Sequence, residues 1–191
     1  MARSKKPYIR YAQDVVEGRQ VAGEYIKKAC QRFLDDMKRR DIQLRYKTID
    51  RCIAFISLLR HTTGKFSGKP FILQPWQQWI VANIVGWYVR DTGCRRFTQS
   101  YIEMSRKQGK TALVAAIALY MLIADYEDGA EVDLAANSKE QAKIAFRMAK
   151  NFAKSLDPEK KDLLAYRAQI QFVLNDAVMN VFAADDCTID G

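Results

Sequence analysis

The sequence has little of what marks membrane, secreted or metal-binding proteins. No apolar run approaches the roughly 18–20 residues that a membrane-spanning helix needs, and the basic N-terminus lacks the apolar segment of a secretory signal. The only histidine is His61, and the four cysteines are scattered without a CxxC pair, so no metal-ligand set is apparent. These absences indicate an intracellular protein whose thiols are reduced.

What the chain does have is enough apolar residues for a core and an uneven distribution of charge. Its 191 residues are 49% hydrophobic and 28% charged, which is typical of a folded protein. Residues 1–70 hold 17 basic and 7 acidic side chains, a net +10, whereas residues 71–191 carry a net −1. The basic excess indicates either a polyanion partner or a solvated helical surface at the front of the chain.

The periodicity of apolar residues predicts two regions, a basic helical one over 1–70 and an α/β one over 71–191. Helical spacing is present over residues 22–37 and 49–59, and a third amphipathic helix is expected after Pro75. The second region is expected to hold a strand over residues 97–104, a buried helix over 112–124 and a short strand over 132–136. A further helix is expected from residue 138 onward, with Ser138 near its cap. This order predicts a parallel sheet with crossover helices.

The most informative segment joins the predicted strand to the predicted buried helix. It reads Ser105-Arg106-Lys107-Gln108-Gly109-Lys110-Thr111. A phosphate-binding loop needs a tight turn before a helix N-terminus, a lysine that reaches the β and γ phosphates, and a hydroxyl that binds Mg²⁺. Gly109, Lys110 and Thr111 meet these needs, but Met104 stands where the common G-x-x-x-x-G-K-[ST] pattern has its first glycine. The segment therefore predicts a variant loop that binds ATP and Mg²⁺.

This loop resembles the variant Walker A loop of the large terminase subunits of tailed bacteriophages, which lacks the leading glycine and carries a basic residue inside the loop. Other segments that resemble the same family are residues 11–16, 22–24, 59–62, 68–71, 74–77 and 135–142. The resemblance covers essentially the whole chain. It implies an α/β fold with a P-loop NTPase-type parallel sheet, incomplete in this chain and preceded by the basic helical region.

The resemblance also implies roles for single residues. Lys110 would hold the β and γ phosphates and Thr111 the Mg²⁺, while Arg106 would stabilise charge on the γ-phosphoryl group, so that Lys110 and Arg106 are the catalytic candidates. Gln77 matches a glutamine that reads adenine, whose N6 and N7 one amide can pair with at once. The expected nucleotide-binding set is Gln77, Ser105, Arg106, Lys107, Gln108, Gly109, Lys110 and Thr111. The alternatives are an ordinary surface helix residue for Gln77 and ordinary surface charges for Arg106 and Lys107.

A second acidic motif, Asp185-Asp186 after an apolar run, looks like a Walker B strand and its catalytic pair. Residues 168–174 and 178–184 are separated by three residues, which permits an antiparallel hairpin but not a parallel crossover. We therefore expect the pair not to be Walker B. The chain is then expected to end before its catalytic acid and to hydrolyse ATP very slowly or not at all.

For the family as a whole, the resemblance implies an ATPase that drives double-stranded DNA into a preformed capsid in the host cell cytoplasm. The partners that it implies are a small terminase subunit and the portal, with an oligomeric ring on the capsid and no membrane. A helicase-like P-loop DNA translocase and a non-catalytic nucleic-acid-binding or regulatory protein remain alternatives. If the basic region contacts DNA, charge reversal at Lys38, Arg39 and Arg40 should lower DNA affinity and flatten its salt dependence.

Overall fold

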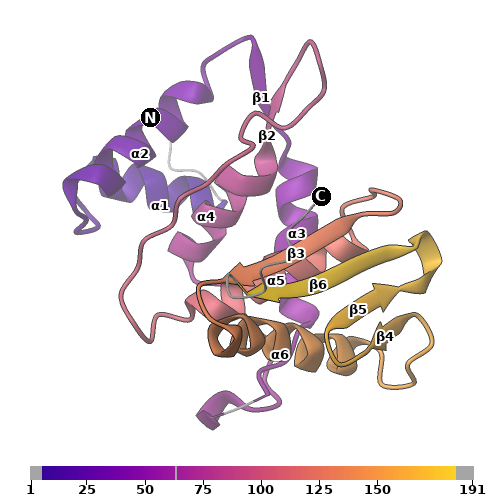
Figure 1. Ribbon diagram of the computed structural model, residues 1–191. Coiled ribbons are helices and arrows are strands. Elements are labelled where there is room, and N and C mark those ends of the chain that lie inside the picture. Colours follow the sequence, from indigo (N-terminus) through magenta and orange to yellow (C-terminus); the bar gives the residue numbers. More distant parts are fainter. Residues whose placement is uncertain (1–5, 63, 184–191) are drawn as a thin grey trace. The chain divides into compact units, whose positions relative to one another are not determined.

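The computed structural model describes residues 6–62 and 64–183, which fall into two compact units (Figure 1). Within these bounds, the first unit contains residues 6–54 and 72–103, and the second contains residues 55–62, 64–71 and 104–183. Each unit is described by itself below.

The first unit is mainly helical, as its sequence predicts. Its helices are α1 (Pro7–Val16), α2 (Glu24–Asp36), the first part of α3 (Tyr46–Leu58) and α4 (Pro75–Gly86). Proline occupies the first helical position of both α1 and α4, where its missing N–H costs nothing. Phe33 meets Trp79 and Trp87 edge-on, with ring centroids 6.5 and 5.4 Å apart, and all three side chains are buried. Helix α4 is apolar on most sides, so it is not the amphipathic helix predicted after Pro75.

A two-stranded antiparallel sheet completes this unit. Strand β1 (Ile42–Leu44) pairs with β2 (Trp87–Val89), so that Ile42 faces Val89 and Leu44 faces Trp87. Each strand has three residues, too few for the alternation of apolar and polar side chains by which a strand is recognised in a sequence. The pair was not predicted, yet it places the start of α3 beside the end of α4.

The second unit packs helices against a four-stranded sheet. Helix α5 (Lys110–Ile123) and helix α6 (Lys139–Leu156) contact each other and the sheet. The strand order is β3-β6-β5-β4, with bounds Glu131–Ala136, Ala177–Ala183, Gln169–Phe172 and Leu163–Ala165. Two short 3-10 helices, Gly64–Phe66 and Val173–Asn175, complete the elements described. The fold is thus α/β, and the Ser138 hydroxyl caps α6 by accepting the N–H of Gln141 at 3.3 Å.

The sheet is mixed, with one parallel and two antiparallel pairings. Strands β5 and β6 form the predicted antiparallel hairpin, while β6 also runs parallel to β3. The crossover that permits the parallel pairing contains α6, β4 and β5, which is ample length for it. Asp185 and Asp186 lie outside the described residues, so the rejection of this pair as Walker B stays a prediction, as does the division of the chain at residue 70.

The predicted strand over 97–104 is wrong. These residues are irregular, and Tyr101 is 89% exposed. Aromatic and β-branched residues favour a strand only when a neighbouring strand pairs with the backbone and one face is buried. Among the described residues, no strand pairs with this segment. The phosphate-loop candidate therefore follows an irregular segment in this structure.

Asp157 supports the junction between α6 and β4, which leads to a prediction on pH. Its Oδ2 accepts the backbone N–H groups of Leu163 at 2.9 Å and Asp162 at 2.8 Å, and these bonds hold the pKa of Asp157 below its usual value. A lowered folded-state pKa stabilises the protein above the unfolded pKa of about 3.9, and this stabilisation is lost as the pH falls through the folded pKa. We expect Asp157→Asn, which cannot titrate, to weaken the loss of stability below about pH 4.

Urea unfolding of the wild type and the variant at neutral and acidic pH measures this effect. Asp162→Asn is the matched control, because its side chain forms neither of the two bonds to Asp157. The same acid dependence in all three proteins would contradict the role of Asp157.

Candidate functional site: a phosphate loop at the start of a buried helix

The predicted loop Ser105–Thr111 enters α5 with a backbone suited to binding an anion. Lys107 and Gly109 both have positive φ angles, 66° and 76°, and Gly109 is the residue that precedes the helix. Alternating left-handed residues turn successive backbone N–H groups toward a concave face, and the helix N-terminus adds its partial positive charge. A side chain at Gly109 would be strained at that φ, which explains the glycine.

The side chains of this loop are available for a ligand. Ser105, Arg106, Lys107, Gln108 and Lys110 are exposed, and Thr111 is half-buried at the first turn of α5. Within residues 6–62 and 64–183, the cationic groups of Arg106, Lys107 and Lys110 form no ion pair or hydrogen bond. The first turn of α5 contains no acidic residue. The loop thus carries three uncompensated positive charges.

Helix α5 holds this loop in place through its apolar side chains. The helix is buried on most sides, and its buried residues are Leu113, Ala115, Ala116, Ile117, Ala118, Leu119, Tyr120 and Leu122. The ring of Tyr120 also meets Phe55 edge-on at 5.8 Å. Since such a helix cannot shift without disturbing close packing, its first turn is a rigid support for Lys110 and Thr111.

Gln77 lies in the first unit and has a structural role that the sequence analysis missed. It is 6% exposed, and its Oε1 accepts the backbone N–H of Gln74 at 2.9 Å, in a reciprocal capping box at the start of α4. The alternative of an ordinary surface residue is therefore wrong. The sequence carried part of the signal, because proline at the first helical position and glutamine at the third are typical of a helix start, whereas Gln74 is not the serine or threonine that a capping box usually has at its N-cap.

The three cations singled out for DNA contact differ in their surroundings. Lys38 pairs with Asp35 at 2.7 Å, and Arg39 forms an ion pair with Asp41 and approaches Oδ1 of Asp36 to 3.5 Å. The hydrogen bonds from Lys38 and Arg39 hold the pKa values of Asp35 and Asp41 below their usual values, so these pairs stay ionised near neutral pH. Arg40 has no such partner within the described part of the chain.

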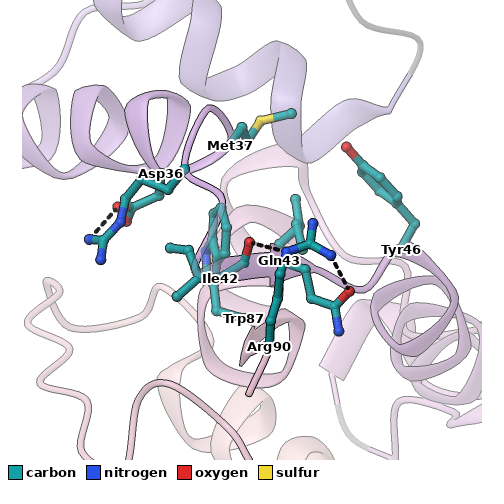
Figure 2. A pocket seen from close by; sticks show the side chains of 9 residues that line it. Asp36, Met37, Ile42, Gln43, Tyr46, Trp87 and Arg90 are labelled. Carbon is teal, nitrogen blue, oxygen red and sulfur yellow. Dashed lines mark hydrogen bonds and ion pairs between the residues drawn. The ribbon is translucent and has the colours of Figure 1, made fainter. Parts of the chain in front are cut away.

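The first unit also contains a cavity of about 210 Å³ that the sequence does not reveal (Figure 2). Its lining residues come from the end of α2, from β1 and from the residues around β2, and they are Asp36, Met37, Arg39, Ile42, Gln43, Leu44, Tyr46, Trp87 and Arg90. Asp36 is buried and lies 2.5 Å from Nη1 of Arg96 and 3.9 Å from Nε of Arg32. A buried carboxylate among arginines is compensated, so Asp36 serves to position them.

Comparison with known proteins decides the family. The sequence model of the terminase large subunit ATPase domain matches residues 75–191, more than half of the chain. The chain belongs to this family. Membership implies nucleotide binding, for which the loop Ser105–Thr111 is the candidate site.

A solved structure agrees with this terminase ATPase assignment at the level of fold. The crystal structure of the HK97 bacteriophage large terminase superposes with a TM-score of 0.62 at 23% sequence identity. The match covers 75% of this chain and 29% of the HK97 chain, so the chain spans less than a third of that protein. A search of curated proteins finds no match.

The described residues contain neither a cluster of metal-binding side chains nor a membrane-spanning helix. Within the described residues, no group of three or more histidine, cysteine, aspartate or glutamate side chains could hold a metal ion. Mg²⁺ in nucleotide sites is held largely by substrate phosphates and water, so such a group of side chains is not required for it. None of the described helices is both long and apolar enough to cross a membrane.

Proposed function

We propose that this chain is the ATP-binding motor region of a phage terminase large subunit. In the protein to which it belongs, ATP hydrolysis would drive double-stranded DNA into a capsid in the host cell cytoplasm, with a small terminase subunit and the portal as partners and a ring of subunits on the capsid. The observation that carries the proposal is Lys110 at the start of the buried helix α5, without a partner among residues 6–62 and 64–183 and inside a region that matches the terminase ATPase family.

In this proposal the parts of the loop have distinct tasks. Backbone N–H groups from Ser105 to Gly109 would surround the phosphates, and the Lys110 ammonium would bind the β and γ phosphate oxygens as a point charge. The hydroxyl of Thr111 would complete the ligands of Mg²⁺. Arg106 is exposed in the loop, and its guanidinium would stabilise charge that develops on the γ-phosphoryl group.

Titration calorimetry with Mg-ATP tests the nucleotide part of this proposal. We expect one binding site per chain, with weaker binding of ATP when the Mg²⁺ is chelated, because the metal neutralises phosphate charge. A chain that is folded, as judged by cooperative unfolding, and that shows no binding of Mg-ATP would contradict the proposal.

The proposed reading of adenine by Gln77 gives a second, separable prediction. Gln77→Glu keeps an oxygen that can accept the Gln74 N–H in the capping box, but it loses the N–H donor that adenine N7 requires. We expect unchanged stability of α4 and about tenfold weaker binding of ATP, the value of roughly one hydrogen bond. Because N7 is an acceptor in adenine and guanine alike, the affinity for ATP is the readout, and not the preference for ATP over GTP.

Titrations with ATP measure this affinity, and urea unfolding measures the stability. Gln78→Glu in the next position is the control for the titrations, because it makes the same chemical change outside the capping box. It is not a control for stability, because it loses the bond from Gln78 Nε2 to the Leu73 carbonyl oxygen. An ATP affinity that is unchanged in Gln77→Glu would contradict the reading of adenine by Gln77.

A further inference from the structure

The distribution of ion pairs in the first unit shows where its excess positive charge lies. All seven carboxylates between residues 6 and 54 form an ion pair, and these are Asp14, Glu17, Glu24, Asp35, Asp36, Asp41 and Asp50. Their cationic partners are Lys6, Arg19, Lys28, Arg32, Lys38, Arg39 and Arg96. The charges of these seven cations are thus compensated locally, and the net charge must be sought elsewhere.

Four cations without a carboxylate partner in the described residues gather at the β1–β2 pair. Arg40 lies two residues before β1, Arg45 and Lys47 follow it, and Arg90 comes directly after β2. We call these four residues the β1–β2 cation cluster. Because the two strands are paired along their length, the residues that flank them are brought to one part of the unit.

Two members of the cluster are held in place by neutral groups. The Arg45 guanidinium stacks on the Tyr88 ring, 3.7 Å from its centroid. Arg90 donates from Nε to the Ile42 carbonyl oxygen at 3.2 Å and from Nη1 to Oε1 of Gln43 at 3.4 Å (Figure 2). These contacts order both guanidinium groups without cancelling their charge. Ordering in advance lowers the entropy cost of binding an anion.

The cavity of the first unit meets this cluster at one residue. Arg90 lines the cavity, whereas Arg40, Arg45 and Lys47 do not line it and are only adjacent in sequence to lining residues. Gln43 and the exposed Tyr46 add polar groups to the same wall. Guanidinium groups with nearby amide and hydroxyl donors are the usual ligands of phosphate and sugar oxygens in a nucleic-acid backbone.

We propose that the β1–β2 cation cluster, together with the cavity beside it, binds the phosphodiester backbone of double-stranded DNA. The inference rests on the proposed function, since it locates the DNA contact of the motor region. It assigns that contact to Arg40, Arg45, Lys47 and Arg90. The paired cations Lys38 and Arg39 belong to the most basic stretch of the sequence, and Arg39 lines the cavity, but they contribute little because carboxylates compensate their charges.

Fluorescence anisotropy with a short duplex of mixed sequence, measured over a series of NaCl concentrations, tests this assignment. The slope of log affinity against log salt falls by about 0.9 for each phosphate group that the protein no longer neutralises. Alanine at all four cluster positions should therefore lower the slope by about 3 to 4. The control variant carries alanine at Arg19, Lys28, Lys38 and Lys27. It removes the same total charge from three paired cations and one unpaired cation outside the cluster, so its slope should change by less than about 1.

The variant Arg45→Lys with Arg90→Lys separates charge from packing. It keeps both charges, so its salt slope should equal that of the wild type, and its thermal unfolding shows whether the unit stays folded. If the fourfold cluster variant loses its cooperative unfolding, single substitutions at the exposed Arg40 and Lys47 give the same readout.

The possible outcomes are distinct. Equal reductions of the slope in the cluster and control variants would overturn the proposal in favour of diffuse charge, and so would an unchanged slope in the cluster variant. Absence of salt-dependent DNA binding by a wild-type chain that still binds Mg-ATP would overturn the inference but leave the nucleotide site. Normal DNA binding by the cluster without any Mg-ATP binding would contradict the proposed function instead.

Discussion

Replacing Lys110 with alanine is expected to weaken Mg-ATP binding by about 10- to 100-fold. A hydrogen bond to a charged group contributes about 1.5–3 kcal/mol, and about 1.4 kcal/mol corresponds to a factor of ten in affinity. The Lys110 ammonium has no partner within the described residues, so the substitution breaks no polar interaction of the folded protein. Its effect should therefore be seen in the dissociation constant and not in the unfolding midpoint.

The loss of Mg-ATP affinity in Lys110→Ala can be compared with that in two other substitutions of the loop. Thr111→Ala should weaken binding of Mg-ATP less than Lys110→Ala but leave binding of metal-free ATP nearly unchanged, because its hydroxyl is assigned to Mg²⁺. Lys107→Ala removes the same charge as Lys110→Ala from an exposed position three residues earlier and should have the smallest effect. Titration calorimetry on the wild type and the three variants measures all four affinities. Equal affinities would show that the nucleotide binds elsewhere.

Replacing Gly86 with alanine is expected to destabilise the protein by about 1–3 kcal/mol, the usual cost of adding volume to a close-packed core. A Cβ at this position would lie 2.6 Å from Cδ1 and 2.7 Å from Cγ1 of Ile49, and 3.1 Å from Cδ1 of Leu44. Ile49 is fully buried and β-branched, so it can move only by displacing its own neighbours. This cost outweighs the gain of up to about 1 kcal/mol that alanine brings to a helix.

Urea unfolding of matched variants can show that crowding is the cause. Gly23→Ala is the control, because its Cβ would meet no atom within 4 Å and its φ is −66°. Gly23 is the N-cap of α2, where glycine is preferred to alanine, so we expect a cost of about 0.5–1 kcal/mol without any crowding. Ile49→Val removes the nearest carbon atom, so the double variant with Gly86→Ala should be more stable than the sum of the two single changes by roughly 0.5 kcal/mol or more. Strict additivity would point to a backbone effect at Gly86 instead.

The parts of the fold that the sequence predicted depend on local signals. Amphipathic spacing before residue 37 marks α2, and Pro75 followed by an apolar run marks α4, although α4 is apolar on most sides. Ser138 is read as a cap because a short polar side chain precedes a helical pattern. The short connection over residues 175–177 identifies the β5–β6 hairpin in the same way. In each case the deciding interaction joins residues that are close along the chain.

The failures depend on partners far away in the sequence. Whether residues 97–104 form a strand is decided by another strand, and the composition of the segment alone cannot supply that partner. The pairing of β1 with β2 joins two segments separated by more than forty residues, and Arg90 is placed by the carbonyl of Ile42 across the same gap. For the candidate site, residue types identified the loop Ser105–Thr111. Which cations of the basic region over residues 1–70 form ion pairs and which do not could be learned only from the three-dimensional structure.

The parallel pairing of β3 with β6 has a consequence for how the second unit is made. Glu131 pairs with Val178 and Ala136 with Ala183, so the strand pair joins segments separated by the whole of α6, β4 and β5. Chain synthesis completes β3 long before β6, and long-range pairing of this kind is slow to form. During synthesis on the ribosome, the backbone of β3 cannot form hydrogen bonds with β6 until β6 has been made, whereas α6 and the β4–β5 hairpin can begin to fold. A nascent chain arrested before residue 177 should therefore expose an unpaired β3 strand to chaperones.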